Sequence, residues 1–367
     1  MVRLGFAGDL SLAVLNAERA CGMEDLASQC KAFTKRVDIA VANLESIVVA
    51  RPGECDRKMA VSADRCHGVE ALGFHVFSLA NNHILDCGQA GLATTEAFLR
   101  ERGMRTVGAG SDLEKAEAPL FVETEGKRIG FLSVTDATHY GARSKVGGVA
   151  PLIPRRLVKS VRRLSRDVDL LLVSVHSDLE FTNFPAPWKV RLSRELVRAG
   201  AHLVIHHHPH TLQGIERYRG GLIAYSLGNF VFPVHGNAYM RGRQGYTHET
   251  VFLTVDVSWN RSAPPDIKYD VIAGIIDDQN RLQIAGRQDA SRIIGRLHTY
   301  SEELDNLDGL RRKYFRMCVG EGKRFVMDLY YSIRKEGVRA GWRFILGHLS
   351  TSQHRNWMRG LLTFGRA

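Results

Sequence analysis

Five short groups of polar residues offer the ligand atoms of a divalent metal ion, and each group follows an apolar run of the sequence. The groups are Asp9; Asn43 with Glu45; Asn82, His83 and Asp86; His176, Asp178 and Glu180; and His206, His207, His208 and His210. Carboxylate and amide oxygens combined with imidazole nitrogens are the donor set of ions such as Mn²⁺, Fe²⁺ or Zn²⁺. We therefore expect one or two divalent ions. A thiolate site is not indicated, because Cys87 alone among the cysteines lies near these groups.

The segment from His206 to His210 is the strongest of these signals. It holds four histidines in five residues, the other residue being Pro209, and it follows a buried run rather than a terminus. We expect at least two of these histidines to be metal ligands. Regular strand alternation would point His206, His208 and His210 to one side and His207 to the other.

Structural alternatives stay open for the other groups. Asp9 follows a predicted strand, where an aspartate often caps a helix or closes a turn. His176 could be a hydrogen-bonded core residue instead of a ligand. Asp86 could orient the imidazole of His83, as carboxylates do beside metal sites, or it could cap the helix expected near Gly88.

The elements that must position these groups alternate along the chain. Short apolar runs predict strands over 3–8, 37–45, 74–83, 128–136, 169–178, 201–210 and 222–232. Helical patterns between them, such as 91–103 and 188–200, end at glycines. This alternation predicts parallel strands in an α/β fold, in which functional groups gather at the carboxyl ends of the strands. Antiparallel strands are predicted over 246–287, and helices over 291–305, 309–319, 321–336 and 338–349.

Composition limits the class of protein. The chain has 367 residues, of which 44% are hydrophobic and 24% charged, so it can bury a sizeable core and is not disordered. It has neither a membrane-spanning apolar run nor a secretory signal pattern. Its six cysteines form no C-x-x-C pair, and we expect reduced thiols in a cytoplasmic protein. A Cys21–Cys30 or Cys55–Cys66 bridge stays open, as does peripheral attachment to a membrane.

Positive charge gathers at the end of the chain. The formal net charge is +11, and residues 287–367 hold 16 Lys and Arg against 8 Asp and Glu. Such a balance favours a polyanionic partner. No motif indicates nucleic-acid binding, and we do not expect a nucleic acid as the partner. The tail mixes arginines with aromatic residues at helical spacing. We favour a helical cap on the fold with solvated arginines over helices that bind a membrane surface or a protein partner.

Six sequence strings together indicate a family. In chain order they are FAGDLSL, ANLES, SLANNHILDCGQAGL, VSVHSD, VIHHHPHTLQGIE and AYSLGNFVF. In this combination the sequence resembles the CapA-type capsule synthesis proteins, which are associated with poly-γ-glutamate and related to calcineurin-like metallophosphoesterases. The resemblance covers about residues 1–260. It implies a layered α/β/β/α sandwich with a two-metal centre at the sheet edge. We expect this domain to span 1–287 and a helical, Arg-rich extension to span 288–367.

Residue by residue, the resemblance implies a set of roles. The implied metal ligands are Asp9, Asn43, Glu45, Asn82, His176, His208 and His210. It implies that His83 acts as an acid or stabilises the transition state, and we add Asp86 as its catalytic partner. We assign His206, Asn229 and Glu180 to substrate binding. The sequence departs from the family pattern at Ser11, at Asp178 and at His206.

The implied activity is metal-dependent hydrolysis of a phosphoester, or of an amide bond in an acidic polymer. The alternative is a non-enzymatic subunit that binds or assembles the polymer, with a structural metal site. In either case we expect an acidic polymer or a phosphoester as partner, and membrane-bound capsule machinery as a further one.

Overall fold

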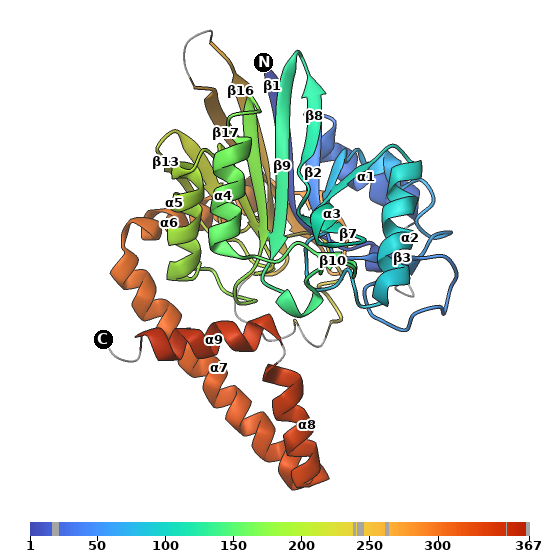
Figure 1. Ribbon diagram of the computed structural model, residues 1–367, viewed down its shortest axis with the longest axis vertical. Helices are drawn as coiled ribbons and strands as arrows, with labels where there is room; N and C mark the ends of the chain where they lie inside the picture. The colour runs from blue at the N-terminus through green and yellow to red at the C-terminus, as the bar shows by residue number, and fades with distance from the viewer. Residues whose placement is uncertain (17–21, 238–239, 241–245, 261–263, 350, 365–367) are drawn as a thin grey trace.

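Two β-sheets pack face to face in the computed structural model, which describes residues 1–16, 22–237, 240, 246–260, 264–349 and 351–364 (Figure 1). Within these residues the first sheet has eight strands in the order β18-β17-β16-β1-β2-β5-β6, with β15 beside β1. In chain order its strands are β1 (Val2–Leu10), β2 (Ile39–Leu44), β5 (Val76–Ser78), β6 (Arg105–Val107), β15 (Asn229–Val231), β16 (Glu249–Ser258), β17 (Asp266–Ile276) and β18 (Leu282–Ile284).

The second sheet has the order β13-β14-β12-β11-β9-β8 in the described part of the chain. Its strands are β8 (Leu120–Thr124), β9 (Lys127–Thr135), β11 (Leu170–His176), β12 (Leu203–His207), β13 (Ile215–Tyr218) and β14 (Gly221–Ala224). Two further short pairs of strands occur in the described residues: β3 (Ile47–Val49) with β4 (Ala60–Ser62), and β7 (Ala109–Gly110) with β10 (Gly148–Val149).

Helices cover the outer face of each sheet. On the first sheet lie α1 (Met23–Thr34) and α2 (Gly88–Glu101); on the second lie α4 (Pro154–Leu164) and α5 (Pro187–Arg198). The remaining short turns of helix are α3 (Leu113–Glu117), η1 (Leu12–Asn16), η2 (Val69–Leu72), η3 (Thr138–Tyr140) and η4 (Glu303–Asp305). Three hydrophobic clusters separate the four layers, and the one between the sheets includes Phe6 and Ile205. The predicted α/β/β/α sandwich is confirmed.

Burial on both faces explains why the central strands form continuous apolar runs. Every residue of β11 is buried, and its neighbours β9 and β12 run parallel to it. The same holds for β2, which lies parallel to β1 and to β5. The antiparallel strands predicted after residue 246 are β16, β17 and β18.

One predicted strand is divided between the two sheets. The run 222–232 forms β14 in the second sheet and β15 in the first, with Gly228 at the crossing. Gly228 has a φ of +75°, which favours glycine. A side chain at Gly8 would overlap the carbonyl oxygen of Gly228, so glycine also allows β1 to approach this turn. As a result Asn229 lies in parallel register with Asp9.

The last part of the chain forms α6 (Arg287–Glu302), α7 (Leu307–Glu336), α8 (Val338–Leu349) and α9 (Ser352–Phe364). Helix α6 packs on β13 and β17. Helix α7 is continuous, where the sequence predicted a break near Gly320, and its second half leaves the sandwich together with α8 (Figure 1). The interpretation of the tail as a helical cap on the fold therefore fits α6 and the start of α7. It does not fit the second half of α7 and α8, which protrude. Within the described residues, no helix is long and apolar enough to span a bilayer.

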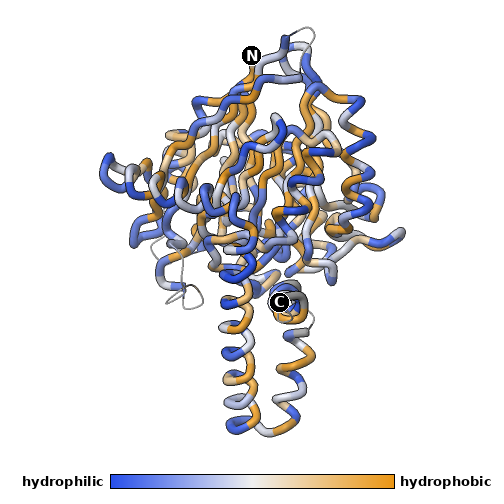
Figure 2. Tube along the Cα trace, turned by 90° about the vertical axis from the view of Figure 1, so that its left-hand side faces the viewer, coloured by the Kyte–Doolittle hydropathy of each residue, from blue (hydrophilic) through white to orange (hydrophobic). Residues whose placement is uncertain are grey.

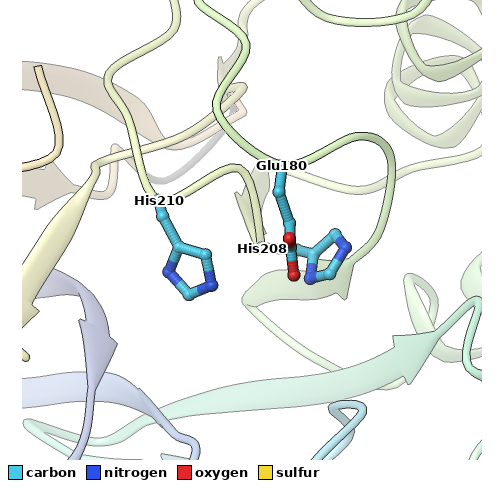
Figure 3. A group of neighbouring side chains, drawn as sticks. All are labelled: Glu180, His208 and His210. Atoms are coloured by element: carbon cyan, nitrogen blue, oxygen red, sulfur yellow. The ribbon is translucent and has the colours of Figure 1, made fainter. Parts of the chain in front are cut away.

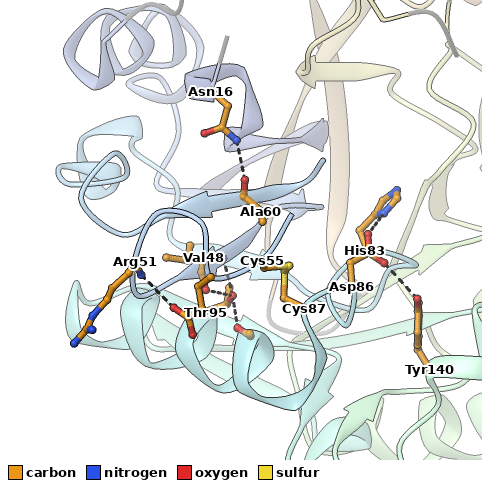
Figure 4. The surroundings of a disulfide bond; sticks show 12 residues. Asn16, Val48, Arg51, Cys55, Ala60, His83, Asp86, Cys87, Thr95 and Tyr140 are labelled. Carbon is orange, nitrogen blue, oxygen red and sulfur yellow. Dashed lines mark hydrogen bonds and ion pairs between the residues drawn. A yellow bond between two sulfur atoms is a disulfide. The ribbon is translucent and has the colours of Figure 1, made fainter. Parts of the chain in front are cut away.

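Two cysteines expected as reduced thiols form a disulfide instead. Cys55 and Cys87 are bonded, which ties the loop after β3 to the start of α2 (Figure 4). The sequence could not show this pairing, because the fold brings the two residues together. A Cys55–Cys66 bridge is thereby excluded, and Cys21 lies outside the described residues. Disulfides are typical of oxidising compartments, so the cysteines do not support the expected cytoplasmic location.

Candidate metal centre

The carboxyl ends of strands from both sheets meet at one edge of the sandwich. Asp9 on β1 lies in register with Asn43 on β2, and Glu45 follows directly. From the second sheet, β11 ends at His176 and β12 ends at His207. All of these side chains are buried. The topology therefore places acidic, amide and imidazole groups from both sheets in one cluster.

Asp9 lies at the centre of this cluster. One carboxylate oxygen accepts a hydrogen bond from the side-chain nitrogen of Asn43 at 2.8 Å, and the other accepts from the backbone of His208 at 3.2 Å. The Nδ1 atoms of His207 and His210 lie 3.5 and 3.4 Å from its oxygens. Burial favours the neutral acid, but the facing imidazoles outweigh burial and hold the pKa of Asp9 well below its usual value. Asp9 is therefore a carboxylate.

Asn43 joins the two sheets through its side-chain amide. Its nitrogen lies 3.2 Å from Glu45 Oε1 and 3.2 Å from His176 Nδ1, besides its bond to Asp9. On the other side of the ring, His176 Nε2 donates to Asn82 Oδ1 at 2.7 Å. Burial and the nearby His208 hold the pKa of His176 well below its usual value. The ring is therefore neutral, and both of its nitrogens are engaged by the side chains of Asn43 and Asn82.

Several buried ligand atoms of the cluster have no hydrogen-bond partner in the described structure. They are Glu45 Oε2, His207 Nδ1 and both ring nitrogens of His208. Burying such atoms without a partner is unfavourable, and a cation would satisfy them. Burial and the neighbouring Asp9 also raise the pKa of Glu45 well above its usual value, which a bound cation would reverse. These features fit a metal site.

Two triplets of residues could each hold a metal ion. Glu180, His208 and His210 form one (Figure 3), and Asp9, Glu45 and His210 form the other. In each triplet the ligand atoms lie within 4.8 Å of one another. Because His210 belongs to both, the two places are adjacent. His210 Nδ1 also lies 2.8 Å from Asn229 Oδ1, which can only accept a hydrogen bond. The ring thus donates from Nδ1 and keeps its Nε2 lone pair available.

His83 and Asp86 form a pair beside these triplets. His83 Nδ1 lies 2.9 Å from Asp86 Oδ2, and the hydroxyl of Tyr140 donates to the other Asp86 oxygen at 3.3 Å (Figure 4). His83 Nε2 faces the cluster, 3.9 Å from Glu45 Oε2. Asp86 does not cap α2, whose N-terminus has no side-chain cap. Of the two open interpretations of Asp86, the structure shows the one in which it orients His83.

Two cavities open on either side of this pair. One has a volume of about 350 Å³ and lies between the sheet edge and the C-terminal helices, where Arg324, His348 and His354 line it. The other, of about 470 Å³, is lined by basic residues of the loop before β4, including Arg57 and Lys58. His83, Asp86 and Glu180 line both cavities. The site can therefore be reached from two directions.

The predicted orientation of the histidine segment is wrong. Strand β12 ends at His207, and His208 and His210 have positive φ values of 97° and 57°, so strand alternation does not extend to them. His207 faces Asp9. His206 points to the opposite side, where its Nε2 lies 2.7 Å from the hydroxyl of Ser193 on α5 and its ring stacks on Tyr225. The structure thus places His206 away from the cavities.

Three other residues have surroundings that the sequence did not indicate. Asn229 is fully buried and contacts His210, and it lines neither cavity. Asp178 accepts from the backbone nitrogen of Ala186 at 2.7 Å and from the hydroxyl of Tyr314 at 3.3 Å, so it faces the extension. Ser11 contacts the hydroxyl of Ser46 at 3.0 Å. The sequence also missed the lining residues of α7 to α9, for which its only signal was the mixture of basic and aromatic residues.

The fold and the site together define an α/β/β/α sandwich with buried carboxylates and imidazoles at one sheet edge. The chain belongs to the family of the bacterial capsule synthesis protein PGA_cap, whose profile matches residues 3–234.

Relatives have names that agree with this family. The chain is 32% identical over 212 residues to the capsule biosynthesis protein CapA of Bacillus anthracis, covering 54% of this chain and 52% of that protein. It is 28% identical over 236 residues to the PGA biosynthesis protein CapA of Bacillus subtilis (strain 168), covering 62% of each. The matches thus span about half to three-fifths of these relatives. A solved 5'-nucleotidase precursor from Thermus thermophilus is similar at 14% identity with a TM-score of 0.46, over 83% of this chain and 59% of that one.

Proposed function

We propose that the chain is a metal-dependent hydrolase that acts on an acidic polymer or a phosphoester in capsule synthesis. The observation that carries this proposal is the set of buried ligand atoms without partners around Asp9 and His210, directly beside a His83–Asp86 pair that is only partly buried. A purely structural site has no need of a histidine that opens to two cavities. The names of the two CapA relatives support the link to capsule synthesis.

The metal would be held by the two triplets, with His176 and Asn82 beside them. Divalent ions bound there would supply a nucleophilic water at neutral pH and polarise the scissile group. Asp86 fixes the ring of His83 so that Nε2 faces the cluster, where it donates a proton to the leaving group. A histidine positioned in this way contributes about 10²- to 10⁴-fold to the rate. Tyr140 holds Asp86 in place through its hydroxyl.

A polymer suits the geometry of the site. The two cavities meet at His83, so a chain could enter through one and leave through the other. Arg57 and Lys58 on one side and Arg324 on the other offer positive charge for an anionic substrate. The bond cleaved would be a γ-glutamyl amide or a phosphoester.

The second candidate function is a subunit that binds or assembles the polymer without hydrolysis. It is favoured by Ser11, one of the departures from the family pattern, which contacts Ser46 instead of the cluster. In that case the metal would hold the sheet edge together, and both cavities would form a binding groove.

An assay on two substrates separates these functions. The protein is loaded with Mn²⁺ and incubated with poly-γ-glutamate and with p-nitrophenyl phosphate, beside the His83→Gln variant. Hydrolysis is supported if the protein releases new amines from the polymer, or nitrophenol from the phosphate ester, and if the rate of release falls at least tenfold in the variant. Tight binding of the polymer without any product, equal in both proteins, favours the binding subunit.

A further inference from the structure

Helices α7 and α8 leave an apolar surface exposed far from the sandwich. We call residues 323–346 of these helices the hairpin. On α7 the side chains of Val326, Met327 and Tyr330 are each more than half exposed, with Val326 at 63%. Their spacing of three and four residues places them on one helix face. On α8 the residues Val338, Trp342 and Leu346 follow every fourth position, with exposures of 62% or more.

The hairpin is a packed element and not a loose tail. Helix α8 runs back along α7, and Gly341 lies so close to Ile333 that a side chain there would overlap it. Figure 2 shows the pair projecting from the sandwich, with hydrophobic residues along both helices as far as the tip. Because α7 and α8 already cover each other, the exposed residues face away from the remaining described chain.

Positive charge surrounds this apolar surface. Lys323, Arg334, Lys335, Arg339 and Arg343 are all exposed on the hairpin. Over residues 321–349 the chain has six Lys and Arg against three Asp and Glu. Apolar and aromatic side chains flanked by basic ones are the pattern of helices that lie in the interface of an anionic bilayer.

We propose that the hairpin docks on the surface of a membrane that contains anionic lipids. The excess of positive charge would oppose association with a second copy of the hairpin, whereas anionic headgroups complement it. The projecting shape also suits a broad surface better than the closed groove of a partner protein. Trp342 and Tyr330 would lie at the headgroup level, where tryptophan and tyrosine are enriched.

Docking would bring the candidate site close to the membrane. Phe325, Asp328, Phe344 and His348 line the smaller cavity at the base of the hairpin. From Phe325 to the end of α7 the helix rises by about 16–18 Å, at 1.5 Å per residue. The mouth of the cavity would therefore lie within about three helical turns of the headgroups. This inference does not depend on hydrolysis and would hold equally for a binding subunit.

Vesicle sedimentation with the full chain tests the proposal. The protein is mixed with vesicles of phosphatidylcholine alone, or of phosphatidylcholine with one third phosphatidylglycerol. We expect binding to the anionic vesicles that is at least tenfold stronger than to neutral ones and that weakens with salt. The emission of Trp342, the most exposed of the four tryptophans, should shift to shorter wavelength on binding, and Trp342→Phe should lose most of that shift.

Two triple variants supply the comparison. The triple variant Tyr330→Ser, Trp342→Ser and Leu346→Ser should lose at least tenfold in vesicle binding and keep its circular dichroism and melting temperature. The control, Ile153→Ser, Tyr269→Ser and Ile284→Ser, removes exposed apolar residues of the sandwich and should bind as the unchanged protein does. Equal loss in both variants, or no preference for anionic vesicles, would overturn the proposal. Self-association that the hairpin variant abolishes, without vesicle binding, would assign the surface to a second copy and would also overturn it.

Discussion

Glu45 shows how the site depends on a cation at the scale of single residues. Its carboxyl is fully buried beside Asp9, and this environment raises its pKa well above the usual value. The two charges repel each other unless one is protonated or a cation lies between them. His176 nearby is held neutral and adds no positive charge that would repel a metal ion. The cluster can therefore bind a metal ion by releasing the proton of Glu45.

Variants of His83 and Asp86 should lose activity without losing metal. We expect His83→Gln to lower kcat by about 10²-fold or more, because the proton donor is lost, and Asp86→Asn to lower it less. Neither variant should change the metal content, since neither residue belongs to a metal triplet. Steady-state kinetics with metal analysis measure both effects. If His83→Gln lost metal together with activity, His83 would be a ligand instead of an acid.

His354 should make the folded state sensitive to acid. Burial, followed by the charge of His348, lowers its pKa from 6.5 to about 4. The unfolded chain therefore binds more protons between these values, so this contribution to stability is complete above pH 6.5 and is lost as the pH falls toward 4. The ring is half exposed, and solvent screening reduces the effect to about 1–2 kcal/mol.

Urea unfolding at pH 7 and at pH 5 measures this effect. The unchanged protein should lose more stability between the two values than His354→Gln does. The same loss in both proteins would show that protonation of His354 has no part in it.

At the scale of elements, the sequence predicted most strands but not the places where the chain changes sheet. The apolar run of β11 is unambiguous because both of its faces are buried. The run 222–232 is equally apolar, yet it is divided between sheets at Gly228, and local periodicity does not register such a crossing. Similarly, the residue types of the histidine segment indicated a site, but strand periodicity does not predict the positive φ values of His208 and His210.

The Cys55–Cys87 disulfide should stabilise the part of the chain that carries β3, β4 and the start of α2. It closes a loop with a sequence separation of 32 residues. In the chain-entropy relation, a loop of this length corresponds to about 3–4 kcal/mol. We expect Cys55→Ser with Cys87→Ser to lower the free energy of unfolding by that amount, measured by urea unfolding. Reductant should destabilise the unchanged protein similarly and leave the variant unaffected; an effect of reductant on the variant would contradict this assignment.

At the scale of the whole molecule, the C-terminal helices complete the site that the sandwich begins. Asn356 on α9 donates to Asp136 Oδ2 at 2.8 Å and to the backbone oxygen of Asp178 at 3.2 Å. The backbone nitrogen of Glu180 donates to Gln353 at 3.4 Å. The extension thus holds the loop that carries Glu180, one member of a candidate metal triplet. The family profile ends at residue 234, so this contribution is a feature of the structure and not of the family match.

Asn356→Ala should therefore disturb the site as well as the helix. We expect a loss of about 1–3 kcal/mol in stability, because buried partners of the amide are left unsatisfied. The KM for a polymer should rise more than the KM for p-nitrophenyl phosphate, since the polymer uses the wall formed by the extension. Asn306→Ala is the matched control: it removes the cap of α7, where Asn306 accepts from Gly309 at 2.8 Å, without touching the site loop. Equal changes in KM for both variants would refute a role for α9 in the site.

Metal content tests the central claim most directly. Protein purified without chelator is analysed for Mn, Fe and Zn beside the double variant His208→Ala with His210→Ala. His206→Gln is the control, because His206 belongs to the same segment but faces α5. The account predicts one to two equivalents of metal in the unchanged protein and in the control, and less than about a tenth of that in the folded double variant. Metal content that is the same in all three proteins, or a folded protein that binds no metal when Mn²⁺, Fe²⁺ or Zn²⁺ is supplied, would contradict the account.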